Sequence, residues 1–141
     1  MAAFNKFDAF VEAVAEKVHN LGTDSLKVYL SNATPSSSAD AVFADLADIA
    51  PGNGYTAGGN VATQTSSSQT AGLYKLVLAD PAAFTASGGS IGPFRYAVLY
   101  NSTPVAGNLI GWWDYGSSIT LASGDTFTVD FDPTTGVLTL Q

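Results

Sequence analysis

The sequence predicts a mainly β protein: a jelly-roll-like antiparallel sandwich or barrel preceded by an N-terminal amphipathic helix. Seven or eight short segments alternate apolar and polar residues, and turn residues separate them at the spacing typical of such folds. The chain contains 14 glycines and 6 prolines, and only 12% of its residues are charged, so Ser, Thr and Asn supply much of its polarity. We expect one domain over residues 1–141, with the helix in residues 1–22 and the β-sandwich in residues 23–141.

The expected helix covers residues 2–20. Phe4, Phe7, Val11, Val14 and Val18 recur at steps of three and four residues, which places them on one stripe of a helix. A glycine two residues later is a common helix stop. Burying an apolar stripe is favourable, so this stripe must cover the β-core or a neighbouring subunit.

The remaining chain is predicted to be mostly strands. The first is residues 26–30, and the others are residues 73–79, 94–100, 109–113, 117–121, 126–131 and 137–140. Residues 40–49 have helical spacing and predict a short helix. Residues 132–136 predict a hairpin loop, from which the last strand pairs back onto residues 126–131. Residues 61–70 are polar and β-prone, which indicates an edge strand or an exposed ribbon.

Composition excludes several classes of function. The net charge is −7 and only five residues are Lys or Arg, so we expect no nucleic-acid partner and no binding to an anionic membrane. The absence of cysteine removes disulfides and thiol chemistry. The apolar runs are far shorter than the roughly 18 residues of a membrane helix. Charged residues interrupt residues 1–20, so no signal peptide is predicted and we expect a soluble protein.

No residue pattern indicates catalysis or a cofactor. His19 is the single histidine, and its position near the expected helix end favours a capping role. Gly88-Gly89-Ser90-Ile91-Gly92 has the Gly-x-Ser-x-Gly spacing, but a loop precedes it and a predicted strand follows, so the strand–turn–helix context of a nucleophile elbow is missing. Asp130 and Asp132 form a pair beside a glycine-containing loop that lacks the ligand spacing of a calcium site. Asp114 lies among aromatic residues, but no second carboxylate can be paired with it for glycoside hydrolysis. We therefore expect no enzyme, no metal and no cofactor.

Residues 91–120 concentrate the aromatic side chains. Trp112, Trp113 and Tyr115 surround Asp114, and tryptophan and tyrosine are favoured anchors of protein interfaces. The same cluster fits a carbohydrate-stacking platform, or a strand that sends Trp113 inward and Trp112 outward. Arg95 is the one arginine, and it is expected to pair with an acid across an interface, to stack on an aromatic ring or to be solvated.

Four segments of the chain resemble a known family. They are AAFNKFDAFVEAVAEKVHNLG at the start, GYTAGG at residues 54–59, GPFRYAVLY at residues 92–100 and GWWDYG at residues 111–116. Together they are similar to the small decoration, or cement, proteins of tailed-bacteriophage heads, and the similarity extends over nearly the whole chain. The resemblance implies a jelly-roll protein without an active site. Such a protein binds the outside of an assembled shell and ties neighbouring major capsid protein subunits together.

We therefore expect a virion protein on the outer surface of a phage head, made in the host cytoplasm. Its expected partners are the major capsid protein and further copies of itself, with a homodimer favoured and a trimer as the alternative. The rival hypothesis is a carbohydrate- or receptor-binding module of a phage tail fibre. The candidate interface residues are Phe4, Phe7, Tyr55, Arg95, Trp112, Trp113 and Tyr115.

Overall fold

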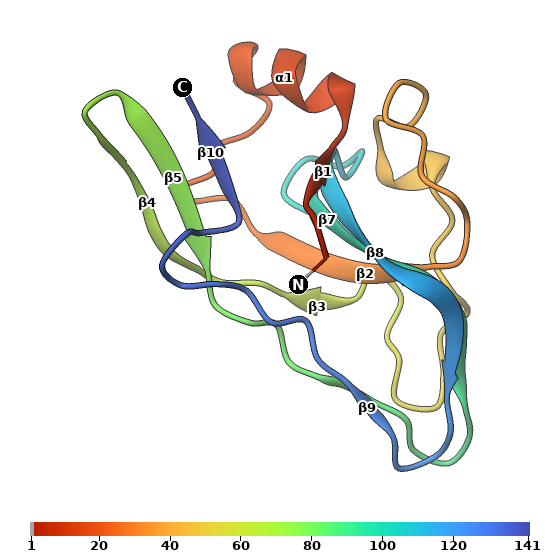
Figure 1. Ribbon diagram of the computed structural model, residues 1–141. Helices are drawn as coiled ribbons and strands as arrows, with labels where there is room; N and C mark the ends of the chain where they lie inside the picture. Colours follow the sequence, from red (N-terminus) through yellow and green to blue (C-terminus); the bar gives the residue numbers. More distant parts are fainter. Residues whose placement is uncertain (1) are drawn as a thin grey trace.

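A computed structural model describes residues 2–141 and contains three antiparallel sheets with one short α-helix (Figure 1). The mainly β, antiparallel class predicted from the sequence is confirmed. The first sheet has the spatial order β1 (Asn5–Lys6), β8 (Leu109–Leu121), β7 (Ile91–Asn101), β2 (Leu26–Ser31) and β3 (Asn60–Val61). The second has the order β10 (Leu138–Leu140), β5 (Leu73–Leu78) and β4 (Gln64–Thr70), and the third pairs β6 (Phe84–Thr85) with β9 (Thr126–Phe127).

The helix is shorter than the sequence predicts. Helix α1 spans Asp8–Ala15 instead of residues 2–20. The preceding Asn5 and Lys6 are extended because they pair with β8, and the following Lys17 has a φ of 65°, which is incompatible with a continuing helix. The buried face also differs from the predicted stripe, since Phe10 is buried whereas Val11 is 52% exposed. None of the helices in residues 2–141 is long and apolar enough to cross a membrane.

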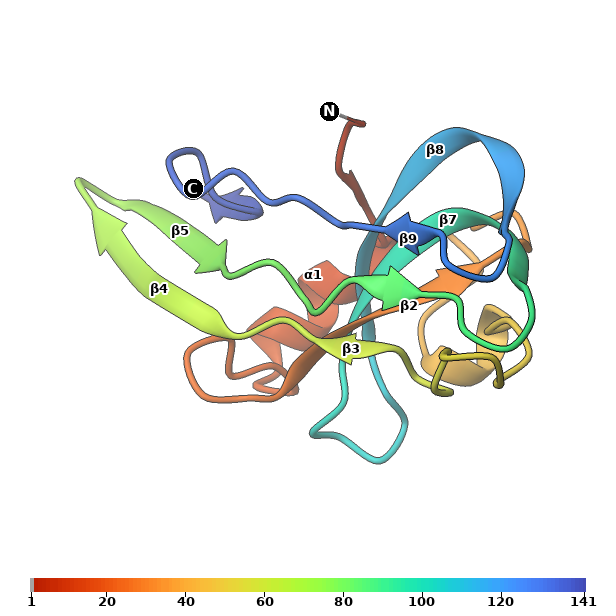
Figure 2. The same cartoon turned by 90° about the horizontal axis from the view of Figure 1, so that it is seen from below.

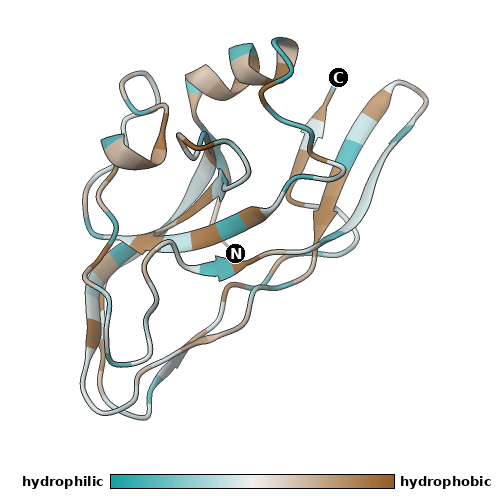
Figure 3. Ribbon diagram, turned by 180° about the vertical axis from the view of Figure 1, so that it is seen from behind, coloured by the Kyte–Doolittle hydropathy of each residue, from teal (hydrophilic) through white to brown (hydrophobic). Residues whose placement is uncertain are grey.

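Apolar clusters pack on both faces of the five-stranded sheet. Figure 3 shows brown bands of apolar residues along its strands. Strand β2 illustrates why. Val28 and Leu30 belong to the main cluster, while Tyr29 between them belongs to a second cluster with Leu46 and Phe7. Successive side chains of a strand point to opposite faces. Strand β2 is therefore a central strand with a core on each side.

One stretch of chain joins the two larger sheets. Residues 60–70 form β3 and then β4, and the backbone N–H of Ala62 still donates to the carbonyl of Leu26 (2.9 Å). Gly59, just before this stretch, has a φ of 70°, and a Cβ there would lie 1.8 Å from the carbonyl oxygen of Val28. Only glycine allows this close approach to β2. Figure 2 shows the chain passing directly from β3 into β4.

Two sequence predictions in the remaining chain are wrong. The predicted hairpin does not form, because β9 pairs with β6 and β10 pairs with β5. The backbone N–H of Phe131 instead donates to Asp80 (2.7 Å), and that of Val137 donates to the carbonyl of Leu76 (2.8 Å), which carries the chain across to the other sheet. The predicted helix at residues 40–49 is a single 3-10 turn, Phe43–Asp45.

Candidate protein-interaction surface

Strand β8 bends away from β7 in the middle of its length. Tyr96 pairs with Asp114 and Phe94 pairs with Ile119, so β8 uses three more residues than β7 over this interval. The extra length forms an outward arch, here called the β8 arch (residues 115–118), and Figure 2 shows β8 curving away from the molecule. Bulges of this kind redirect side chains and are frequent beside functional sites.

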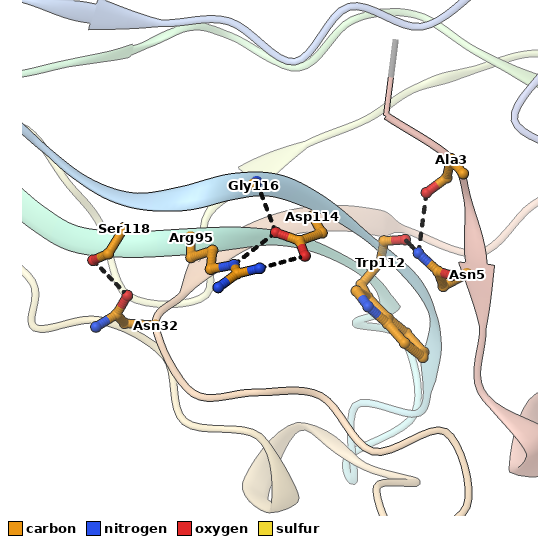
Figure 4. Close-up of polar contacts among 8 residues, drawn as sticks. All are labelled: Ala3, Asn5, Asn32, Arg95, Trp112, Asp114, Gly116 and Ser118. Atoms are coloured by element: carbon orange, nitrogen blue, oxygen red, sulfur yellow. Dashed lines mark hydrogen bonds and ion pairs between the residues drawn. The ribbon is translucent and has the colours of Figure 1, made fainter.

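An ion pair fixes one end of the β8 arch (Figure 4). Nε of Arg95 donates to Oδ1 of Asp114 (2.8 Å), and its second guanidinium nitrogen donates to Oδ2 (2.9 Å). The backbone N–H of Gly116 also donates to Asp114 (2.8 Å). These hydrogen bonds, that of Arg95 first, lower the pKa of Asp114. Both side chains are about 40% exposed, so the pair lies at the surface and holds the arch in one conformation.

The other end of the arch is tied to a loop, and its tip is exposed. The hydroxyl of Ser118 donates to the side-chain carbonyl of Asn32 (2.8 Å; Figure 4). Tyr115 is 55% exposed and meets Phe127 edge-on, with ring centroids 5.8 Å apart. The arch therefore presents one aromatic ring on a constrained backbone, which lowers the entropy lost when a partner binds.

The two tryptophans lie on opposite faces of β8. The ring of Trp112 packs on Phe7 at 4.5 Å, in the second cluster. The ring of Trp113 packs between Phe4 (5.2 Å) and Phe131 (5.4 Å), against the main cluster. Both tryptophans are partly buried. The two indoles therefore form no common flat platform, and each has an edge available to a partner on its own side.

Two candidate interface residues are instead internal. Phe7 is fully buried, and Tyr55 is 3% exposed. The hydroxyl of Tyr55 donates to the carboxylate of Asp48 and accepts the backbone N–H of Leu30 (3.0 Å). Burial raises the pKa of both Tyr55 and Asp48. Tyr55 lies between glycines in the sequence, but its ring is buried and its hydroxyl has both of its hydrogen-bond partners within the chain.

His19 is not the predicted helix cap. Helix α1 ends four residues earlier, and His19 is 7% exposed beside Phe10. The side-chain amide of Asn101 donates to its Nδ1 (3.2 Å), while Nε2 has no hydrogen-bond partner. Burial lowers the pKa of His19, and the nearby charge of Asp24 partly opposes that shift. The residue is a packed, neutral imidazole at the end of β7.

Asp130 and Asp132, the candidate metal ligands of the sequence analysis, occupy different environments. The carboxylate of Asp132 accepts the backbone N–H groups of Thr134 (2.7 Å) and Thr135 (3.2 Å), as expected for the first residue of a turn. Asp130 is exposed on the segment before it. Over residues 2–141, no three His, Asp or Glu side chains are grouped so as to hold a metal ion.

A second exposed feature is strand β4, which reads QTSSSQT and lies at the edge of the three-stranded sheet. All of its residues except Gln64 are exposed, on both faces. The sequence predicted this polar edge strand correctly. The β8 arch was not predicted, although a glycine in the middle of a long β segment was the available signal.

No family model matches this sequence, and neither a curated protein nor a solved structure matches it.

Proposed function

We propose that this chain is a non-enzymatic decoration protein that binds the outer surface of a tailed-phage head and strengthens contacts between major capsid protein subunits. The four sequence segments that resemble cement proteins motivate the proposal. The proposal also includes a jelly-roll arrangement of the sheets and assembly of the protein as a homodimer. Many copies on one shell would gain avidity, so that no single contact needs to be large.

The observation that carries the proposal is the projecting β4–β5 hairpin (Figure 1). Strand β4 has a free edge, and its Ser, Thr and Gln side chains contribute nothing to the core. Free edges are liabilities that proteins usually protect, unless another chain pairs with them. An edge of this kind can extend a sheet of a partner, where backbone hydrogen bonds supply affinity. A capsid lattice offers many identical partner edges.

The β8 arch supports the same proposal. Tyr115 is an exposed aromatic ring, and Arg95 lies beside it in a bidentate ion pair with Asp114. Tyrosine and arginine are enriched among residues that dominate binding energy. The arch and the β4 edge would then give the protein two separate contacts, as a clamp between neighbouring capsid subunits requires.

Binding to undecorated phage heads tests the proposal. Purified protein should bind such heads saturably, at a fixed number of copies per shell. Replacing Ser66 and Ser68 with lysine places charges on the β4 edge and should reduce occupancy at least tenfold, because edge lysines oppose strand pairing. The control variant Thr34→Lys/Ser38→Lys has the same net charge and alters an exposed loop away from β4, so it should bind normally.

A carbohydrate- or receptor-binding module is the alternative. The exposed Tyr115, next to a small apolar cavity lined by Trp113 and Phe127, is the feature that favours it. Binding to cell-surface glycans that is lost in Tyr115→Ala, together with no binding to heads, would support this alternative and overturn the capsid proposal.

A further inference from the structure

The two larger sheets form one curved, incomplete ring. Residues 60–61 pair in the first sheet and residues 64–70 in the second. Through this one stretch of chain the strands follow one another as β1, β8, β7, β2, β3–β4, β5 and β10, with every neighbouring pair antiparallel. Counting β3 and β4 as one position, the ring has seven strands, an odd number. Its two edge strands, β1 and β10, therefore run in the same direction, and both run toward the side of α1 in Figure 1. An antiparallel ring of this kind closes only with an eighth strand.

A continuous trough lies where that strand is missing. Three adjoining cavities of about 530, 170 and 120 Å³ follow the seam between β1 and β8 on one side and the C-terminal segment on the other. Phe4, Gly136 and Val137 line the first and second cavities, while Trp113 and Phe131 line the second and third. The trough therefore runs from β10 to the β8 arch. Its β1 side is formed by Lys6 of β1 and by the preceding residues Ala2 and Phe4, which line the cavities.

The floor of the trough is apolar. The rings of Phe4, Trp113 and Phe131 form a stack across it, with neighbouring centroids 5.2 and 5.4 Å apart. Leu138 is buried, and Leu140 is half-buried at the upper end. An inserted strand would direct every second side chain toward this floor. Those side chains must be apolar, and they must be small beside Trp113 and Phe131, where the cavities measure only about 170 and 120 Å³.

The charges at the two ends of the trough have opposite sign. Lys6 lies at the β10 end, and it is the one charged residue lining the largest cavity. Asp130 and Asp132 line the two smaller cavities toward the β8 arch. A strand antiparallel to β1 would begin near Lys6 and end near Asp130. Charge complementarity therefore calls for an acidic residue near the start of the inserted segment and a basic residue near its end.

We propose that the seam between β1 and β10 is a docking site for an extended segment of another protein, which binds as the eighth strand. The segment alternates small apolar residues with polar ones, is acidic at its N-terminal end and basic at its C-terminal end. This chain does not supply it, because its apolar period-two segments within residues 2–141 are already paired in the sheets and β4 is polar. The proposal does not depend on the capsid function.

A designed peptide tests the site with the full-length protein. The probe has about ten residues, alternates valine with threonine, and carries glutamate near its N-terminus and lysine near its C-terminus. We expect saturable binding that shifts the amide signals of Asn5, Lys6 and Leu138–Leu140 and the indole signal of Trp113 in NMR spectra. A control peptide of the same composition, with its valines grouped together, should not bind because it lacks the alternation.

Charge reversal provides the second measurement. Lys6→Glu should weaken binding of the probe by about two- to fivefold, as for an exposed ion pair, and a probe with lysine in place of its N-terminal glutamate should regain the loss. Lys17→Glu carries the same charge change outside the trough and should have no effect. Equal binding of the control peptide, or shifts confined to β4, would overturn the proposal. Dimerisation through the seam without peptide binding would also overturn it, because a second copy would then be the occupant.

Discussion

The five-stranded and three-stranded sheets differ in how they use their side chains. Strands β2 and β7 are buried over most of their length, and the five-stranded sheet has an apolar cluster on each face. In the three-stranded sheet one end of β5 and Leu138 of β10 are buried in the main cluster, and β4 is exposed. The first sheet is thus covered by apolar residues on both faces, whereas the second reaches the core only in part. Strand β4 is held mainly by backbone pairing with β5, which suits a surface that gains its remaining contacts from a partner.

The largest expected difference between these regions is in the free energy of unfolding that is lost when a side chain is truncated to alanine. Phe94 of β7 is fully buried and meets Phe127 edge-on at 5.0 Å, so Phe94→Ala should lower the free energy of unfolding by about 3–5 kcal/mol. Leu73, at the start of β5, is 40% exposed, and Leu73→Ala should cost less than about 1 kcal/mol. Urea denaturation measures both. Similar losses for the two variants would show that the sheets are equally cooperative.

A smaller loss is expected from the buried hydroxyl beside β2. Tyr55→Phe leaves the backbone N–H of Leu30 without its acceptor and removes the donor to Asp48. It should lower the free energy of unfolding by about 1–3 kcal/mol. Tyr115→Phe is the matched control on the exposed arch, and we expect no measurable loss. Denaturation curves for the two variants compare the same chemical change in both settings, and equal stability of the two would contradict a structural role for the Tyr55 hydroxyl.

His19 should make stability depend on pH. Burial lowers its pKa in the folded state below the value of about 6.5 that it has when exposed. The unfolded chain therefore binds its proton first as the pH falls, so the full stability is present above about pH 6.5 and is lost below it. Thermal unfolding of the native protein and His19→Gln between pH 7.5 and 5 should show a shallower decline for the variant. Parallel declines for the two proteins would contradict this expectation, because they would show that His19 takes up its proton equally in the folded and unfolded states.

The smallest effect is expected at the β8 arch. Arg95→Gln removes an ion pair whose two side chains are each about 40% exposed, and exposed pairs contribute little to stability. The melting temperature should change little, while the NMR signals of Gly116 and Ser118 should broaden as the arch loosens. A large fall in melting temperature would contradict this expectation, because it would show that the arch unfolds together with the core.

Sequence patterning predicted the strands whose alternation is strong. Strands β2, β5 and β7 lie where the apolar and polar residues alternate, and the polar pattern of β4 correctly indicated an exposed edge. Local periodicity reports burial of one face, which is a local property. The fold class could be read from it for that reason.

The remaining errors come from long-range pairing. Residues 2–7 have helical spacing, yet Asn5 and Lys6 pair with β8 more than a hundred residues later. Residues 132–136 resemble a hairpin turn, yet β10 finds its partner in β5. The candidate site was predicted in part for the same reason: Trp113 and Tyr115 do reach the surface or its margin, whereas Phe7 and Tyr55 are enclosed by residues distant in sequence. A short stretch of sequence around Phe7 or Tyr55 does not show which distant residues will enclose that side chain.

The contact of Gly59 with β2 makes this one position unusually intolerant of change. A methyl group there would collide with the carbonyl of Val28, and the chain would have to move away from β2 just before it enters β3 and β4. Because that stretch belongs to both sheets, even the modest replacement Gly59→Ala would disturb the rigid and the exposed half together. Natural variants of this protein should therefore keep glycine at residue 59 more strictly than at residue 124, where a Cβ would meet no atom within 4 Å and only the φ of 97° disfavours another residue.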